Sequence, residues 1–117
     1  MVERRSPRRH YKDTALQSWL AAVCERTRAA ELVLADAAGL LVAGGQHRGA
    51  AEELAAEAAR HPRAPAGAPL RITPAATAVV RALTWDDEDL LLIATGEGAC
   101  AMAALEEAPA GIRRILA

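Results

Sequence analysis

The sequence predicts a single α/β domain in which the elements follow the order helix, strand, strand, helix, three strands, helix. Three observations predict this order. Apolar residues recur at helical spacing between residues 14 and 27, two short aliphatic runs flank a turn within residues 31–45, and two longer β-rich segments are joined by the acidic residues 86–88. A chain of 117 residues suits one packed core, which we place at residues 13–117.

The first predicted helix begins near Asp13 or Thr14. Thr14 and Gln17 have the spacing of a capping box, in which the two side chains satisfy free backbone N–H groups. The apolar face that follows consists of Leu16, Trp19, Leu20 and Val23. We interpret Trp19 as a core anchor rather than as a platform for a ligand.

A bare aliphatic hairpin follows, with the sequence ELVLADAAGLLVAGG at residues 31–45. Strands are predicted at residues 32–34 and 40–42. Asp36 can hydrogen-bond the turn backbone, and Gly39 can adopt a positive φ. The next helix, at residues 50–60, carries a stripe of mostly alanine, and small side chains permit close packing.

The second half of the chain begins with a break rich in proline and glycine, HPRAPAGA at residues 61–68. Strands are predicted at residues 70–73, 77–85 and 89–95. Residues 90–94 are almost wholly aliphatic and indicate a central strand buried on both faces. The last helix runs from Ala99 to the end of the sequence, and Pro109 predicts either a kink or two short helices.

The composition excludes several classes of protein. A net charge of -1 is unlike a whole-domain nucleic-acid binder, so no nucleic acid is expected as a partner. The chain has neither a signal-peptide pattern nor an apolar run long enough to span a membrane. Cys24 and Cys100 lack metal or redox spacing and are interpreted as small buried hydrophobes. We therefore expect a cytoplasmic protein.

Groups that usually perform catalysis do not converge in this sequence. His10, His47 and His61 lack the spacing of zinc ligands, and residues 95–98 lack the glycine spacing and lysine of a phosphate loop. The acidic run at residues 86–89 lacks the alternation of a calcium loop and is interpreted as a soluble hairpin tip. We therefore expect that the protein is not an enzyme and that it binds neither a cofactor nor a metal ion. An enzymatic alternative stays open if either cysteine is reactive.

The first twelve residues are predicted to form a flexible, solvated tail. It is rich in arginine, which also allows an electrostatic contact with a partner, an anionic lipid surface or nucleic acid. The residues that would make this contact are Arg4, Arg5, Arg8 and Arg9.

Four segments resemble the bacterial branch of the roadblock family, which is named for dynein light chains. They are LVLADAAGLLVAGG, AAEELAAEAAR, DLLLIATGEG and AGIRRILA, and the resemblance spans about residues 14–117. It implies a layered, roadblock/profilin-like α+β fold with a five-stranded antiparallel sheet, one helix on one face and two on the other. It also implies dimerisation through the second helix and third strand, here Ala51, Leu54, Ala55, Ala58, Leu70 and Ile72.

The same resemblance implies a non-catalytic dimeric interaction module that regulates or scaffolds a small Ras-like GTPase. The dimer would form with a second copy or with a paralogous roadblock protein. The alternative is a small-ligand sensory domain of the GAF or PAS kind, in which a sheet is also flanked by helices. The absence of phenylalanine disfavours that alternative, because such pockets usually have aromatic walls.

Overall fold

The computed structural model describes residues 7–60, 67–73 and 76–117, with the side chains of residues 12–60, 67–71 and 77–117. The predicted break at residues 61–68 therefore lies mostly outside the described residues. The elements are α1 (Pro7–Thr27), β1 (Glu31–Asp36), β2 (Leu41–Gly44), α2 (Arg48–Ala59), β3 (Ala68–Thr73), β4 (Ala76–Trp85), β5 (Glu88–Thr95) and α3 (Gly98–Leu116). The predicted order of elements is confirmed.

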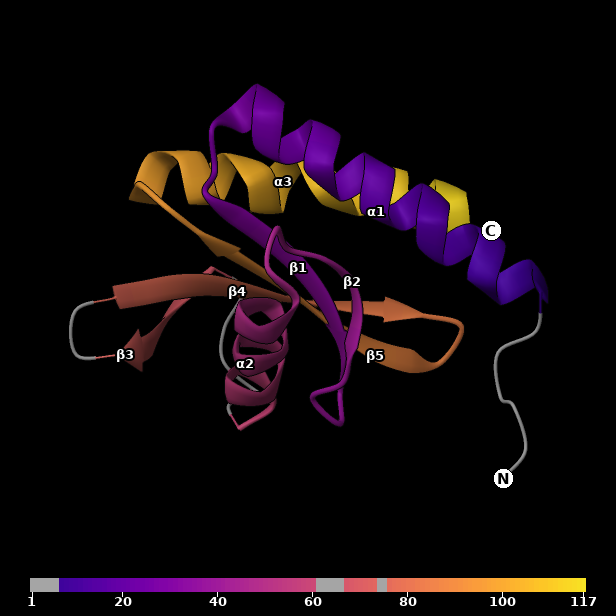
Figure 1. Cartoon of the computed structure of the whole chain (residues 1–117), viewed down its shortest axis with the longest axis horizontal. Helices are drawn as coiled ribbons and strands as arrows, with labels where there is room; N and C mark the ends of the chain where they lie inside the picture. Colours follow the sequence, from indigo (N-terminus) through magenta and orange to yellow (C-terminus); the bar gives the residue numbers. More distant parts are fainter. Residues whose placement is uncertain (1–6, 61–66, 74–75) are drawn as a thin grey trace.

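The strands form one antiparallel sheet in the order β2-β1-β5-β4-β3. Helices α1 and α3 cover one face of this sheet and α2 covers the other, as Figure 1 shows. This is the layered arrangement of five strands and three helices that the sequence predicts.

The bare aliphatic hairpin is explained by the position of β1 inside the sheet. β1 pairs with β2 on one side and with the central strand β5 on the other. Leu32 and Leu34 face α1 and α3, whereas Val33 and Ala35 face α2. Both faces of β1 are therefore buried, and an aliphatic strand without polar side chains satisfies both layers. β5 is buried on both faces in the same way over residues 90–94, as predicted.

The turn between β1 and β2 has the predicted chemistry. The Asp36 carboxylate accepts hydrogen bonds from the backbone N–H groups of Ala38 (2.9 Å) and Leu40 (3.0 Å). Gly39 has a φ of +89°, a conformation that glycine adopts without steric strain. The turn fixes the register in which the two aliphatic runs pair.

Helix α1 begins at Pro7, so the predicted start at Asp13 or Thr14 is wrong. Proline suits a first helical turn because its missing N–H group has no partner there in any case. Residues 7–12 thus belong to α1, although the sequence assigns them to a tail. The Lys12 ammonium donates to the Leu116 carbonyl (2.9 Å), which joins this part of α1 to the end of α3.

The predicted capping box is wrong for the same reason, because Thr14 and Gln17 lie inside α1. The Gln17 side chain instead bonds to the end of β2. It accepts from the Gly44 N–H (2.7 Å) and donates to the Gly45 carbonyl (3.4 Å). One amide therefore attaches α1 to the end of the β1–β2 hairpin.

Helix α3 continues through Pro109, so the prediction of two short helices is wrong. Pro109 has no N–H group to donate to the carbonyl of Leu105, four residues earlier. The Arg81 guanidinium, which comes from β4, donates to that carbonyl at 3.3 Å. A long-range hydrogen bond thereby replaces the intrahelical bond that proline removes.

We predict that Arg81 and Pro109 are energetically coupled. Arg81→Met should lower the free energy of unfolding by about 1–2 kcal/mol, because the buried Leu105 carbonyl loses its donor. In a Pro109→Ala background the restored N–H can bond that carbonyl, so the same substitution should have less than half this effect. Chemical denaturation of the four proteins of this cycle measures the coupling. Equal effects of Arg81→Met in both backgrounds would contradict the prediction.

Trp19 packs α1 against α3 and confirms the interpretation of this residue as a core anchor. Its indole N–H donates to the Ala108 carbonyl (3.0 Å). The guanidinium groups of Arg26 and Arg114 lie 5.2 Å and 5.8 Å from its ring centroid. The ring lies directly against Gly111, where an added Cβ would overlap it. Gly111 therefore sets how closely the two helices approach.

Candidate functional site

The predicted interface residues of α2 are buried within the single chain. Ala51, Leu54, Ala55 and Ala58 pack on the sheet face formed by Val33, Ala35, Leu91 and Ile93. The small side chains allow α2 to lie close to the hairpin, since a Cβ at Gly45 would overlap the Ala51 methyl group. The alanine stripe therefore has a role in the chain's own core.

The structure describes the side chain of only one of the two predicted interface residues of β3. Leu70 belongs to the same buried cluster as α2 and is 5% exposed. Ile72 lies in β3, and its side chain is outside the described side chains. The existence of β3 is confirmed, and the strand begins two residues before the predicted position at Leu70.

The outer face of α2 and the neighbouring strand β3 form what we name the α2–β3 surface. β3 pairs with β4 alone among the described strands and lies at an edge of the sheet. α2 contacts β3 directly. The exposed residues of α2 are Arg48, Gly49, Ala50, Glu52, Glu53 and Ala56, followed by the C-cap residue Arg60. An edge strand has unpaired backbone groups, which can pair with another strand.

Charges of both signs lie along α2, with three glutamates between Arg48 and Arg60. Arg48 lies 3.8 Å from Glu52, and Arg60 lies 3.0 Å from Glu57. Exposed pairs of this kind contribute about 0–1 kcal/mol. These side chains are therefore able to exchange their partners for those of another molecule at little energetic cost.

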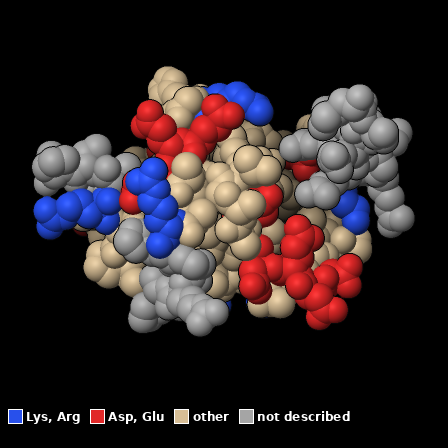
Figure 2. Space-filling model, turned by 90° about the horizontal axis from the view of Figure 1, so that it is seen from below, with Lys and Arg blue, Asp and Glu red and all other residues tan. Residues whose placement is uncertain are grey.

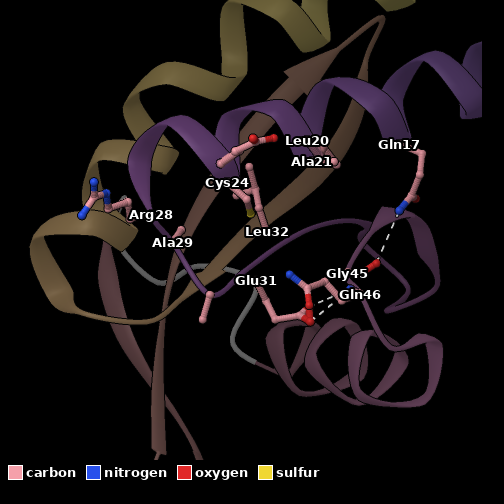
Figure 3. Close-up of a pocket in the computed structure, with 12 residues that line it drawn as sticks. Gln17, Leu20, Ala21, Cys24, Arg28, Ala29, Glu31, Leu32, Gly45 and Gln46 are labelled. Carbon is pink, nitrogen blue, oxygen red and sulfur yellow. Dashed lines mark hydrogen bonds between the residues drawn. The ribbon is translucent and has the colours of Figure 1, made fainter.

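A pocket of about 430 Å³ lies beneath α1, at the open end of the β1–β2 hairpin, where β1 begins and β2 ends (Figure 3). Figure 3 shows that Gln17 and Glu31 both reach toward Gly45 and Gln46. The Glu31 carboxylate accepts from the Gln46 N–H at 3.0 Å. Gln17 thus holds the end of the hairpin against α1, and Glu31 holds the backbone that follows β2.

The same pocket contains Cys24, one of the two cysteines on which the enzymatic alternative depends. Burial raises the pKa of the Cys24 thiol, and the nearby negative charge of Glu31 raises this pKa further. A raised pKa keeps sulfur in the thiol form at neutral pH, whereas the thiolate is the nucleophile. The environment of Cys24 is therefore opposite to that of a catalytic cysteine.

The histidines, the possible metal ligands and the glycine turn at Gly96 do not form a site among the described residues. His47 is exposed at the N-cap of α2, whereas the side chains of His10 and His61 are outside the described ones. Among the described side chains, no group of three could hold a metal ion. Gly96 has a φ of +116° and lies against the backbone of Ala30, whose N–H donates to Thr95 (2.9 Å). This glycine turn therefore packs on the chain itself.

The structure describes the backbone of only two of the four arginines in the predicted tail. Arg4 and Arg5 lie outside the described residues. Arg8 and Arg9 belong to α1, and their side chains are not described. Among the described helices, none is both long and apolar enough to cross a membrane.

Comparison with known proteins decides the fold. No protein-family model and no curated protein matches this chain. The solved structure of Myxococcus xanthus MglB is similar to it, with a TM-score of 0.64 over 99% of this chain and 94% of that one. The chain has a roadblock-like fold. The match confirms the roadblock-like, layered α+β architecture over nearly the whole of both chains.

Sequence identity to MglB is 14%, so the likeness establishes the roadblock-like fold alone. In this fold the α2–β3 surface combines an exposed helix with an unpaired strand edge. Because an edge strand can pair with a strand of another protein, the α2–β3 surface is a candidate contact surface.

Proposed function

We propose that this chain is a non-catalytic, dimeric interaction module that regulates or scaffolds a small Ras-like GTPase in the bacterial cytoplasm. The observation that carries the proposal is the roadblock-like fold with a free strand edge beside an exposed helix face. The raised pKa of Cys24 also favours a binding role over nucleophilic catalysis. No residue of the chain is proposed to react.

The proposed dimer forms through the α2–β3 surface. Two β3 strands related by a two-fold axis would pair along their free edges and join the two sheets. The two α2 helices would then lie antiparallel, crossing near the small residue Ala56. Four residues separate Ala56 from both Glu52 and Arg60, so each Glu52 would lie opposite the Arg60 of the second copy.

The buried stripe of α2 has an indirect part in this dimer. Ala51, Leu54, Ala55 and Ala58 hold α2 against the sheet, and Leu70 holds β3 in the same cluster. We propose that these residues, together with Ile72, position the helix and the strand, whereas exposed groups make the contacts. A paralogous roadblock protein could replace the second copy if its charges are complementary.

The proposed effect on the GTPase is a shift of its conformational equilibrium. The joined sheet of the dimer would offer a rigid surface to the GTPase. The dimer would change the switch region of the GTPase only by binding one conformation of that region more tightly than the other. The arginines Arg4, Arg5, Arg8 and Arg9 are proposed as a further electrostatic contact to this partner.

The first test is the molar mass of the 12.3 kDa chain, measured by light scattering over a concentration series. We expect twice the mass of the chain. Small Ras-like GTPases of the source organism are then tested for a complex and for altered rates of GTP hydrolysis and nucleotide release. A chain that is monomeric at every concentration and binds none of them would contradict the proposal.

A sensory domain is the second candidate, and the pocket beneath α1 favours it. Its volume of about 430 Å³ is within the range of small-molecule sites. A specific ligand would raise the melting temperature, which a thermal-shift screen detects. Substituting Leu20 or Leu32 in the pocket wall should then weaken binding of that ligand.

A further inference from the structure

A second groove lies beside the β4–β5 turn. Figure 1 shows that this turn and β3 are at opposite ends of the sheet. The groove has a volume of about 430 Å³ and is enclosed by the beginning of α1, the β4–β5 turn and the end of α3. Leu16, Leu34 and Leu90 form an apolar floor. Asp86 and Glu88 on its rim are exposed. An apolar floor with an acidic rim is an environment for a segment that is both aliphatic and basic.

Trp85 gives the groove its specific chemistry. It is half-buried at the end of β4, pairs with Glu88 across the hairpin and precedes Asp86. Among the described residues, both contacts between a cation and an aromatic ring are made by Trp19. The Trp85 ring therefore has no cation from those residues, although the acidic residues Asp86 and Glu88 line the same groove. A groove that combines an indole ring with carboxylates suits a guanidinium or ammonium group.

Among the described charged side chains, those around the groove are mostly acidic. Asp86, Asp87, Glu88 and Asp89 are all exposed at the β4–β5 turn. Figure 2 shows acidic side chains gathered at this end of the molecule. Lys12 also lines the groove, but its ammonium is bonded to the Leu116 carbonyl (2.9 Å). Charge complementarity thus favours a positively charged occupant.

We propose that this groove binds a basic amphipathic segment of a partner protein. An arginine or lysine of that segment lies on Trp85 between Asp86 and Glu88, and an adjacent aliphatic side chain lies on the leucine floor. The groove is remote from the α2–β3 surface, so both surfaces can be occupied together. The inference does not depend on the proposed GTPase partner.

The test uses a labelled peptide in which arginine and leucine alternate, titrated with the full chain by fluorescence anisotropy at low salt. Asp86→Asn combined with Glu88→Gln should weaken binding at least about tenfold. Trp85→Leu should weaken it several-fold through loss of the ring. Circular dichroism verifies that the variants are folded, and the exposed Asp86 and Glu88 keep the test valid if Trp85→Leu is unfolded.

The matched control is Glu97→Gln combined with Glu106→Gln, which removes the same charge from exposed positions at the N-cap of α3 and within α3. It should change peptide affinity less than twofold. A peptide with serine in place of leucine, or with glutamate in place of arginine, should bind at least about tenfold more weakly. Equal effects of the two double variants would overturn the proposal, as would equal binding of the serine peptide. Binding that appears only after removal of residues 1–6 would also overturn it, because the chain's own basic segment would then be the occupant.

Discussion

Gly111→Ala is expected to lower the melting temperature by more than about 10 °C, which corresponds to about 3 kcal/mol for a domain of this size. The new methyl group would overlap the Trp19 ring. This ring cannot move freely, because its N–H donates to Ala108 and two arginines lie over its faces. Helices α1 and α3 must therefore separate, which exposes part of the core between them.

Gly49→Ala is the matched control for this prediction. Gly49 lies in the first turn of α2, has no atom near an added Cβ and should gain about 0.5–1 kcal/mol from the helix propensity of alanine. Thermal unfolding followed by circular dichroism compares the two variants. Trp19→Leu should reduce the effect of Gly111→Ala, because a smaller side chain leaves room for the methyl group. A destabilisation below about 1 kcal/mol would show that the helices are not in the tight contact described here.

The β1–β2 hairpin could be predicted from the residues themselves because hydrophobic patterning and turn chemistry agree there, whereas the five-stranded antiparallel sheet is implied by the resemblance to the roadblock family. In the run Leu32, Val33 and Leu34 no polar residue alternates with the apolar ones. This pattern indicates a strand that is buried on both faces. Asp36 and Gly39 identify the turn that pairs it. These strand and turn signals lie within a few residues of one another, so they can be recognised in the sequence without knowledge of the fold.

Contacts between distant residues could not be predicted in the same way. Pro109 predicts a kink or two short helices, because the sequence does not show that the fold brings Arg81 to the Leu105 carbonyl. Residues 8–12 look like a charged tail, yet arginine and lysine are good helix formers and Pro7 suits the start of α1. The groove at Trp85 is formed by three segments that are far apart in the chain.

The alanine stripe of α2 shows a further limit of sequence analysis. A small-residue face predicts a close approach, but the sequence does not reveal whether the neighbour is another helix or the chain's own sheet. In this chain Ala51 and Ala55 meet the sheet. In the proposed dimer, contacts with the second copy would therefore come from the exposed residues of α2. In the sequence these residues have the pattern of an ordinary solvated helix face.

Reversing the charge of Arg60 is expected to weaken the proposed dimer by at least about thirtyfold. The two-fold axis repeats every contact, so Arg60→Glu places two glutamates opposite Glu52 residues instead of two arginines, a loss of about 2 kcal/mol. Glu52→Arg should have the same effect. Folding should change little, because the intrachain pairs of Arg60 with Glu57 and Glu52 with Arg48 are exposed.

The double variant Glu52→Arg with Arg60→Glu restores opposite charges across the axis and should recover most of the dimer affinity. Light scattering over a concentration series measures all three variants, with Glu106→Arg on the exposed side of α3 as the matched control. Recovery in the double variant alone would support antiparallel α2 helices that cross near Ala56, because parallel helices would not place residue 52 opposite residue 60. If the double variant dimerises as weakly as the single variants, the two residues do not face each other and the proposed geometry of the α2–β3 surface is wrong.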